Sequence, residues 1–165
     1  MTVVILNRPR HADLISEVRK TGARIQLIGD GDVASAVAAA WPDSGVDLLI
    51  GIGGAPEGVI AAAAMQCLGG DFQGKLKFRS EEERARATRM GVKDLDKKFK
   101  IDDLARGSVM FIATGVTDGS LLKGVRFLPD NKAKSYSLVM RSSTGTIRMM
   151  EAHHDLSRKP KAMNG

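Results

Sequence analysis

Residues 51–58, Gly-Ile-Gly-Gly-Ala-Pro-Glu-Gly, have the composition of a loop that binds phosphate. Glycine lacks a Cβ atom, so the backbone can approach a ligand closely. Proline suits the first position of a helix, and the loop would then point N–H groups and the positive end of a helix dipole outward. The carboxylate of Glu57 would repel a phosphate unless a cation lay between them. Its presence therefore indicates a bridging metal ion.

The same loop also has a simpler interpretation. A strand, a glycine turn and a helix form a common α/β connection, and a glutamate in a first helical turn is favoured by the dipole without any ligand. The segment does not match two known phosphate-binding fingerprints, because Pro56 replaces the third glycine of a dinucleotide loop and no Gly-Lys-Ser/Thr sequence is present. Both interpretations stay open at this point.

Two arginines flank a proline near the start of the chain, in the order Arg8, Pro9 and Arg10. Proline favours an extended backbone before it, and in an extended segment two side chains that are two residues apart point the same way. Two guanidinium groups in this arrangement could bind one or two phosphates bidentately. The alternative is a pair of surface arginines without a ligand.

Two aspartates flank a glycine in the same way, in the order Asp30, Gly31 and Asp32. Their carboxylates could bind sugar hydroxyls or a hard cation. An Asp-Gly-Asp turn before a helix is also a normal helix cap. We expect one aspartate to cap the helix and the other to be available for binding.

The elements that would position these motifs alternate along the first 70 residues. Apolar patterns predict strands at residues 3–6, 23–28 and 46–50, and helices at 12–21, 33–41 and 59–68. Such alternation favours parallel strands covered by helices, and ligands then bind beyond the carboxyl ends of the strands. Because each motif follows one strand, we expect all three to meet at one rim of the sheet.

The remainder of the chain is less regular. The sequence predicts a polar helix at residues 80–90, a strand at 109–113, and a hairpin that pairs residues 135–141 with 146–150. Thr114 and Gly115 could be a further rim contact or a turn. Residues 158–165 are expected to be a disordered tail after a single α/β domain that spans residues 1–157.

Composition narrows the class of protein. Of the 165 residues, 43% are hydrophobic and no apolar run approaches the roughly 20 residues that span a bilayer. The N-terminus lacks a secretion signal, and the single cysteine, Cys67, fits a reducing cytoplasm and a buried structural role. We therefore expect a cytoplasmic protein without membrane contact.

The net charge of +6 fits either a phosphorylated small molecule or nucleic acid. Acidic residues alternate with the basic ones between positions 75 and 100, and aromatic residues are only 4% of the chain, which argues against nucleic acid. The histidines and Cys67 show no metal-ligand spacing. His11 is expected to be a hydrogen-bonded structural residue.

Taken together and in this order, the three rim motifs resemble those of the class II, bacterial-type fructose-1,6-bisphosphatases, and residues 113–117 are similar to a later motif of that family. The resemblance covers essentially the whole chain but only the second half of the family's sequence. It implies a layered αβα sandwich of the sugar phosphatase and inositol monophosphatase type, with mainly parallel strands in this half. Asn7 stands where the family pattern has aspartate.

The resemblance also implies site residues and chemistry. Substrate would contact Arg8, Pro9 and Arg10, then Asp30, Gly31 and Asp32, and the backbone of Gly54, while Glu57 would ligate Mn²⁺ or Mg²⁺. The implied reaction is hydrolysis of fructose 1,6-bisphosphate in gluconeogenesis, with sedoheptulose 1,7-bisphosphate as a further substrate in some relatives. No catalytic residue is assigned, because most metal-binding carboxylates of the family belong to its first half.

Two hypotheses follow. In the first, the sequence is the C-terminal part of a metal-dependent bisphosphatase. In the second, it is a non-catalytic sugar-phosphate-binding half-domain, or a subunit that needs a separate N-terminal piece. A half-length chain could also expose a sheet edge or an apolar face, so we expect self-association into a homo-oligomer or assembly with the complementing half.

Overall fold

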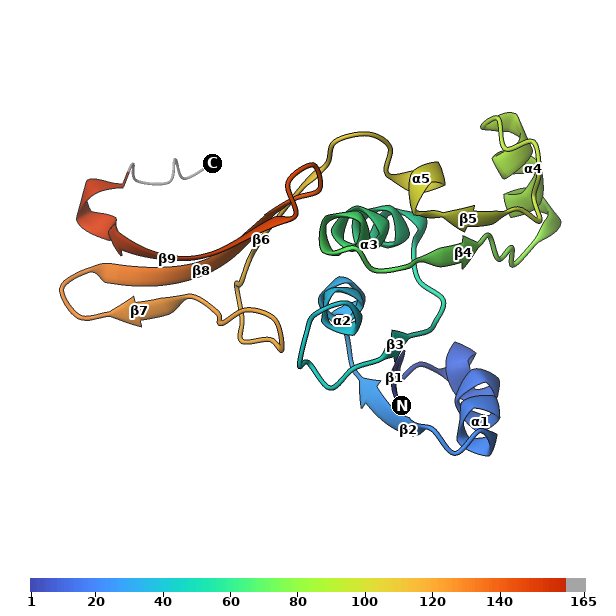
Figure 1. The fold of residues 1–165 in the computed structure, drawn as a ribbon, viewed down its shortest axis with the longest axis horizontal. Coiled ribbons are helices and arrows are strands. Elements are labelled where there is room, and N and C mark those ends of the chain that lie inside the picture. Colours follow the sequence, from blue (N-terminus) through green and yellow to red (C-terminus); the bar gives the residue numbers. More distant parts are fainter. Residues whose placement is uncertain (160–165) are drawn as a thin grey trace.

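The computed structural model describes residues 1–159 and contains a mixture of parallel and antiparallel sheets (Figure 1). In chain order the elements are β1 (Thr2–Leu6), a 3₁₀ helix (Pro9–His11), α1 (Ala12–Lys20), β2 (Arg24–Ile28), α2 (Asp32–Ala39), β3 (Leu48–Leu49), α3 (Ala55–Leu68), β4 (Gln73–Lys75), α4 (Glu81–Arg89), β5 (Lys98–Lys100), α5 (Ile101–Leu104), β6 (Met110–Thr114), β7 (Arg126–Leu128), β8 (Lys132–Arg141), β9 (Thr146–Asp155) and a second 3₁₀ helix (Leu156–Arg158).

The first three strands form a parallel sheet in the order β2-β1-β3. Apolar side chains of β1 alternate between its two faces, as the period of a strand requires. Val3 and Ile5 pack with Ile15 of α1 on one face. The helices α2 and α3 lie on the other side of the sheet (Figure 1).

A second sheet is antiparallel and lies on the far side of α3. The strands β6 and β7 both pair with one side of β8, and β9 pairs with the other side along its whole length. Phe111 of β6 and Leu138 and Met140 of β8 are buried in the same core as Ala64 and Met65 of α3. The layers therefore run from α1 through the parallel sheet and the α2–α3 layer to the antiparallel sheet.

A two-stranded antiparallel sheet, β4-β5, lies beside the helix α4. This helix begins after Ser80, whose hydroxyl accepts a hydrogen bond from the N–H of Glu83 at 3.3 Å. A serine cap followed by three glutamates is a normal helix start, because both satisfy or complement the exposed N–H groups. The polar helix predicted at residues 80–90 is confirmed.

Most of the predicted elements are present, but the strand predicted at residues 46–50 is reduced to the two residues of β3, and two further differences follow. Within residues 1–159, parallel strands are confined to β1, β2 and β3, and all six later strands pair antiparallel, so the expectation of mainly parallel strands is wrong after Leu68. The hairpin is also longer than predicted, because β8 and β9 have ten residues each.

Among residues 1–159, no helix has the length and apolarity that crossing a membrane would require. Of the tail predicted from residue 158, residues 160–165 lie outside the part that the structure describes.

Candidate functional site

The three motifs lie where the parallel strands end, at one edge of the sheet. Residues 8–10 follow β1, residues 30–32 follow β2, and residues 51–58 follow β3 and lead into α3. Parallel strands bring their carboxyl ends to the same edge, so the alternation of elements predicts this convergence. Hydrogen bonds between the motifs confirm that they meet.

The two arginines connect the first motif to the other two. A terminal nitrogen of Arg8 donates to the carbonyl of Gly29 at 2.6 Å, and Nε of Arg10 donates to the carbonyl of Ile52 at 2.9 Å. Both side chains are exposed. A guanidinium has five N–H donors, so each arginine retains donors beyond these contacts.

The backbone around Pro9 differs from the expectation. Arg8 is extended, with φ −133° and ψ 146°, but Pro9–His11 form a 3₁₀ helix. Arg8 and Arg10 therefore do not share an extended segment, and their side chains reach different neighbouring loops. The prediction that both guanidinium groups point the same way from an extended Arg-Pro-Arg segment is wrong. The two arginines instead contact different loops of the rim.

His11 is the buried centre of this arrangement, with no exposed surface. Its Nδ1 lies 2.8 Å from the carbonyl oxygen of Leu6, and its Nε2 lies 2.8 Å from the backbone nitrogen of Ile52, which donates to it. One ring nitrogen must donate and the other accept, which is the neutral imidazole with its proton on Nδ1. The structural role predicted for His11 is confirmed.

The ring of His11 also explains the first glycine of the loop. A Cβ atom at Gly51 would lie 3.3 Å from Cε1 of His11, tighter than most packed contacts. The end of β1 and the start of the glycine loop therefore fit together through one buried imidazole. The loop sequence depends on this packing as well as on any ligand.

The aspartates do not cap the second helix as expected. The residue at the cap of α2 is Gly31, with φ 85°, and no side chain makes a capping hydrogen bond. Asp32 is instead the first residue of α2, and a Cβ atom at Gly53 would lie 3.1 Å from its Oδ2. The carboxylate of Asp32 thus faces the glycine loop, while Asp30 is exposed.

Glu57 lies in the first turn of α3, which begins at Ala55, so Pro56 is the second helical residue rather than the first. The exposed carboxylate of Glu57 bends back over Gly54, where a Cβ atom would collide with it. This position places a negative charge at the positive end of the helix dipole. No salt bridge involves Glu57 within the described residues.

The residues present do not make a metal site by themselves. Residues 1–159 contain no group of three or more His, Cys, Asp or Glu side chains that could hold an ion. A divalent cation bound by protein oxygens needs several such ligands. Glu57 could supply one ligand, and the others would have to come from outside this rim.

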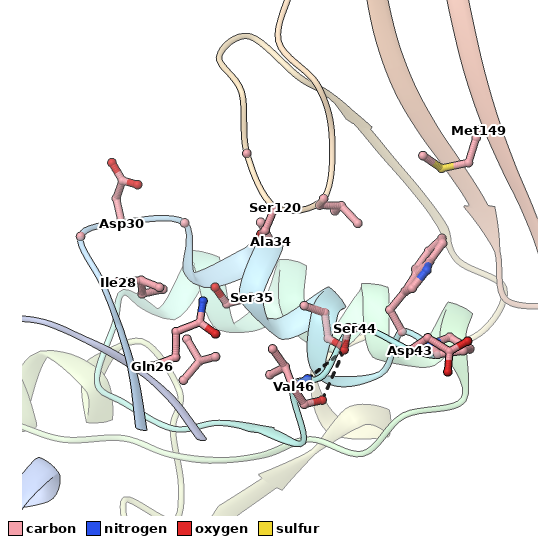
Figure 2. Close-up of a pocket in the computed structure, with 18 residues that line it drawn as sticks. Gln26, Ile28, Asp30, Ala34, Ser35, Asp43, Ser44, Val46, Ser120 and Met149 are labelled. Atoms are coloured by element: carbon pink, nitrogen blue, oxygen red, sulfur yellow. Dashed lines mark hydrogen bonds between the residues drawn. The ribbon is translucent and has the colours of Figure 1, made fainter. Parts of the chain in front are cut away.

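A pocket of about 680 Å³ adjoins the rim (Figure 2). Asp30 lies at one end of it and Met149 of β9 at the other, with Ser35 of α2 and Ser120 along its length. The Asp30-Gly31 turn belongs to the pocket, but the arginines and residues 51–58 do not line it. The pocket therefore extends from the second motif toward the antiparallel sheet.

The loop that contributes Ser120 could not be located from the sequence. It is fixed by Asp118, whose carboxylate accepts from the N–H of Gly124 at 2.9 Å and from Arg126 at 2.7 Å. The N–H of Gly124 and the charge of Arg126 lower the pKa of Asp118 below its usual value. The neighbouring Thr114 ends β6, and its hydroxyl forms a hydrogen bond with that of Ser137 in β8.

Comparison with known proteins gives one consistent result. Residues 1–154 match the family model described as bacterial fructose-1,6-bisphosphatase, glpX-encoded. A relative from Trichodesmium erythraeum (strain IMS101), named D-fructose 1,6-bisphosphatase class 2/sedoheptulose 1,7-bisphosphatase, is 44% identical over 93% of this chain and 48% of its own length. A relative of the same name from Synechococcus sp. (strain JA-3-3Ab) is 42% identical with the same coverage.

The chain spans about half the length of the curated relatives it matches. The family match itself covers nearly all of the described residues, including the three rim motifs and both large sheets. The chain belongs to the family of bacterial, glpX-encoded fructose-1,6-bisphosphatases.

Proposed function

We propose that this chain is the sugar-phosphate-binding C-terminal part of a metal-dependent bisphosphatase, with residues 1–157 as its α/β domain. The reaction would be hydrolysis of fructose 1,6-bisphosphate to fructose 6-phosphate and phosphate, a step of gluconeogenesis in the cytoplasm, with sedoheptulose 1,7-bisphosphate as a second substrate. The observation that carries the proposal is the convergence of three polar motifs on one rim, held together by Arg8, Arg10 and His11.

The proposed roles follow from the chemistry of each group. Arg8 and Arg10 would each offer substrate phosphate the donors that their backbone contacts leave over, and Pro9 would contact substrate from the 3₁₀ helix between them. Asp30, Gly31 and Asp32 would bind sugar hydroxyls. The backbone at Gly54 would approach the substrate closely because a side chain there has no room beside Glu57.

Glu57 would contribute one ligand to Mn²⁺ or Mg²⁺. Such an ion would shield phosphate oxygens and lower the pKa of an attacking water. The remaining carboxylates would come from the half of the family's chain that this sequence does not span. For that reason we expect the chain alone to bind a sugar bisphosphate weakly and to release no measurable phosphate.

A chimera tests the proposal, with this chain replacing the matching half of the Trichodesmium erythraeum relative. We expect the chimera to release phosphate from fructose 1,6-bisphosphate in the presence of Mn²⁺. Glu57→Ala should reduce the rate of phosphate release by orders of magnitude, because the ion would lose a ligand. Glu82→Ala is the matched control, since Glu82 is also an exposed glutamate in the first turn of a helix. Equal rates for the two variants would exclude Glu57 from the mechanism.

The second candidate function is a non-catalytic sugar-phosphate-binding half-domain. It is favoured by one observation, that the described residues hold no cluster of three metal-binding side chains. Phosphate release by the chimera decides between the candidates. If the chimera binds fructose 1,6-bisphosphate but never hydrolyses it, the binding function stands and the enzymatic one fails.

A further inference from the structure

One face of the antiparallel sheet carries several exposed apolar side chains. Alternate residues of β6 and β8, such as Phe111 and Met140, are buried against the α2–α3 layer. The residues between them point to the opposite side, which we call the open sheet face and define as Met110, Ile112, Val139 and Met150. Met110, Ile112 and Met150 are 58%, 64% and 46% exposed.

The position of this sheet explains why the face is bare. The layers end with the antiparallel sheet, and in Figure 1 the hairpin of β8 and β9 extends away from the helices. No strand pairs with the outer edge of β9 among residues 1–159, so its N–H and C=O groups are also available. A sheet with apolar residues on both faces is stable when both faces are covered. An exposed apolar face next to an open edge therefore marks an interface.

The charges on this face are all positive. Arg141 stands opposite Met110 in the ladder, and Arg148 stands opposite Val139, so both project from the same side as the apolar residues. Both arginines are exposed and neither has an ion pair in the described part of the chain. No aspartate or glutamate stands on this side of β6, β8 or β9, since Glu151 and Asp155 pair with residues of the opposite face.

We propose that the open sheet face binds the half of the family's chain that this sequence does not span, through a surface of apolar side chains with carboxylates opposite Arg141 and Arg148. The curated relatives are about twice as long as the region they share with this chain, so a polypeptide of the required size exists in the family. The inference rests on family membership and does not depend on the proposed phosphatase activity.

A second copy of this chain is a poorer occupant. In a two-fold symmetric dimer the same patch meets itself, so Arg141 and Arg148 of one copy would face a surface that carries arginines and no carboxylates. Juxtaposed like charges oppose association. The charge pattern therefore favours a different, acidic partner over self-association.

Methionine oxidation tests the proposal directly, because the chain offers its own control. Met90, at the end of α4, is 79% exposed and lies outside the open sheet face. The probe is the half of the Trichodesmium erythraeum relative that this chain does not match, co-expressed with the full chain. We expect a one-to-one complex in which Met110 and Met150 oxidise at least tenfold more slowly than in the chain alone, while Met90 is unchanged.

Two variants localise the contact. Ile112→Ser combined with Met150→Ser should weaken the complex at least tenfold, and Arg148→Glu should do so through charge, whereas Met90→Ser should leave it unchanged. Three results would overturn the proposal. The first is the absence of a complex, both by co-expression and by joint refolding of the halves. The second is unchanged oxidation of Met110 and Met150 in the complex. The third is protection of these methionines in a dimer of this chain that the other half does not displace.

Discussion

The rim of the parallel sheet and the antiparallel sheet use their arginines differently. At the rim, Arg8 and Arg10 bond backbone carbonyls of neighbouring loops and so hold three distant segments together. On the open sheet face, Arg141 and Arg148 lie beside exposed apolar side chains with no partner in the described residues. The first arrangement supports the proposed phosphate site, and the second supports the proposed contact with another protein surface.

The largest expected effect is at the buried imidazole of the rim. His11→Ala removes the partner of the Ile52 N–H and one of two partners of the Leu6 carbonyl, and it leaves a cavity, so we expect a loss of roughly 3 kcal/mol in the free energy of unfolding. Urea unfolding followed by circular dichroism measures it. His153→Ala is the control in the other region, because this side chain is exposed and a change below about 0.5 kcal/mol is expected. Similar losses for both variants would mean that the imidazole does not hold the rim together.

The next effect distinguishes the two sets of arginines by ligand. Arg8→Met and Arg10→Met should each weaken binding of fructose 1,6-bisphosphate to the chimera by about tenfold, which corresponds to the loss of one charge-assisted contact. Arg148→Met should leave that affinity unchanged. Calorimetric titration measures all three. If Arg148→Met weakened the affinity for fructose 1,6-bisphosphate as much as Arg10→Met, the proposed difference between the rim and the open sheet face would be contradicted.

A smaller effect concerns the loop between the regions. The pKa of Asp118 is lower in the folded chain than in the unfolded chain. Its ionised carboxylate therefore stabilises the fold fully at pH values above the pKa that Asp118 has in the unfolded chain. That contribution is lost as the pH falls through the lower, folded pKa. We expect Asp118→Asn to lower stability slightly at pH 7 and to weaken the dependence of stability on pH in acid. Unfolding midpoints between pH 7 and pH 3 test this, and an unchanged acid slope would contradict it.

The sequence predicts the rim better than it predicts the side chains within it. Repeated apolar segments and glycines indicate the parallel strands, and strand direction alone then brings the motifs together. The roles of individual side chains depend on contacts across the fold. The contact between His11 and Ile52 joins residues 41 positions apart. Asp32 begins α2 behind a Gly31 cap, and its carboxylate lies beside Gly53 of a distant loop.

The antiparallel sheet was predicted only in part for a related reason. Its hairpin has a clear alternating pattern, but the short strands β4, β5 and β7 have three residues each and no distinctive signal. Their pairing is decided by partners that are remote in sequence. The sequence pattern of a strand with apolar residues on both faces is the same whether its second face is exposed or covered by another part of a protein. The exposure of this face therefore becomes visible only in the structure.

The most direct test of the convergent rim is an amide NMR titration of this chain with fructose 1,6-bisphosphate. We predict that the amide signals of the non-proline residues within 8–11, 29–32 and 51–58 shift together along one binding curve, while those of β6 and β9 do not move. Shifts confined to one motif, or separate curves for the three motifs, would contradict a single sugar-phosphate site at this rim.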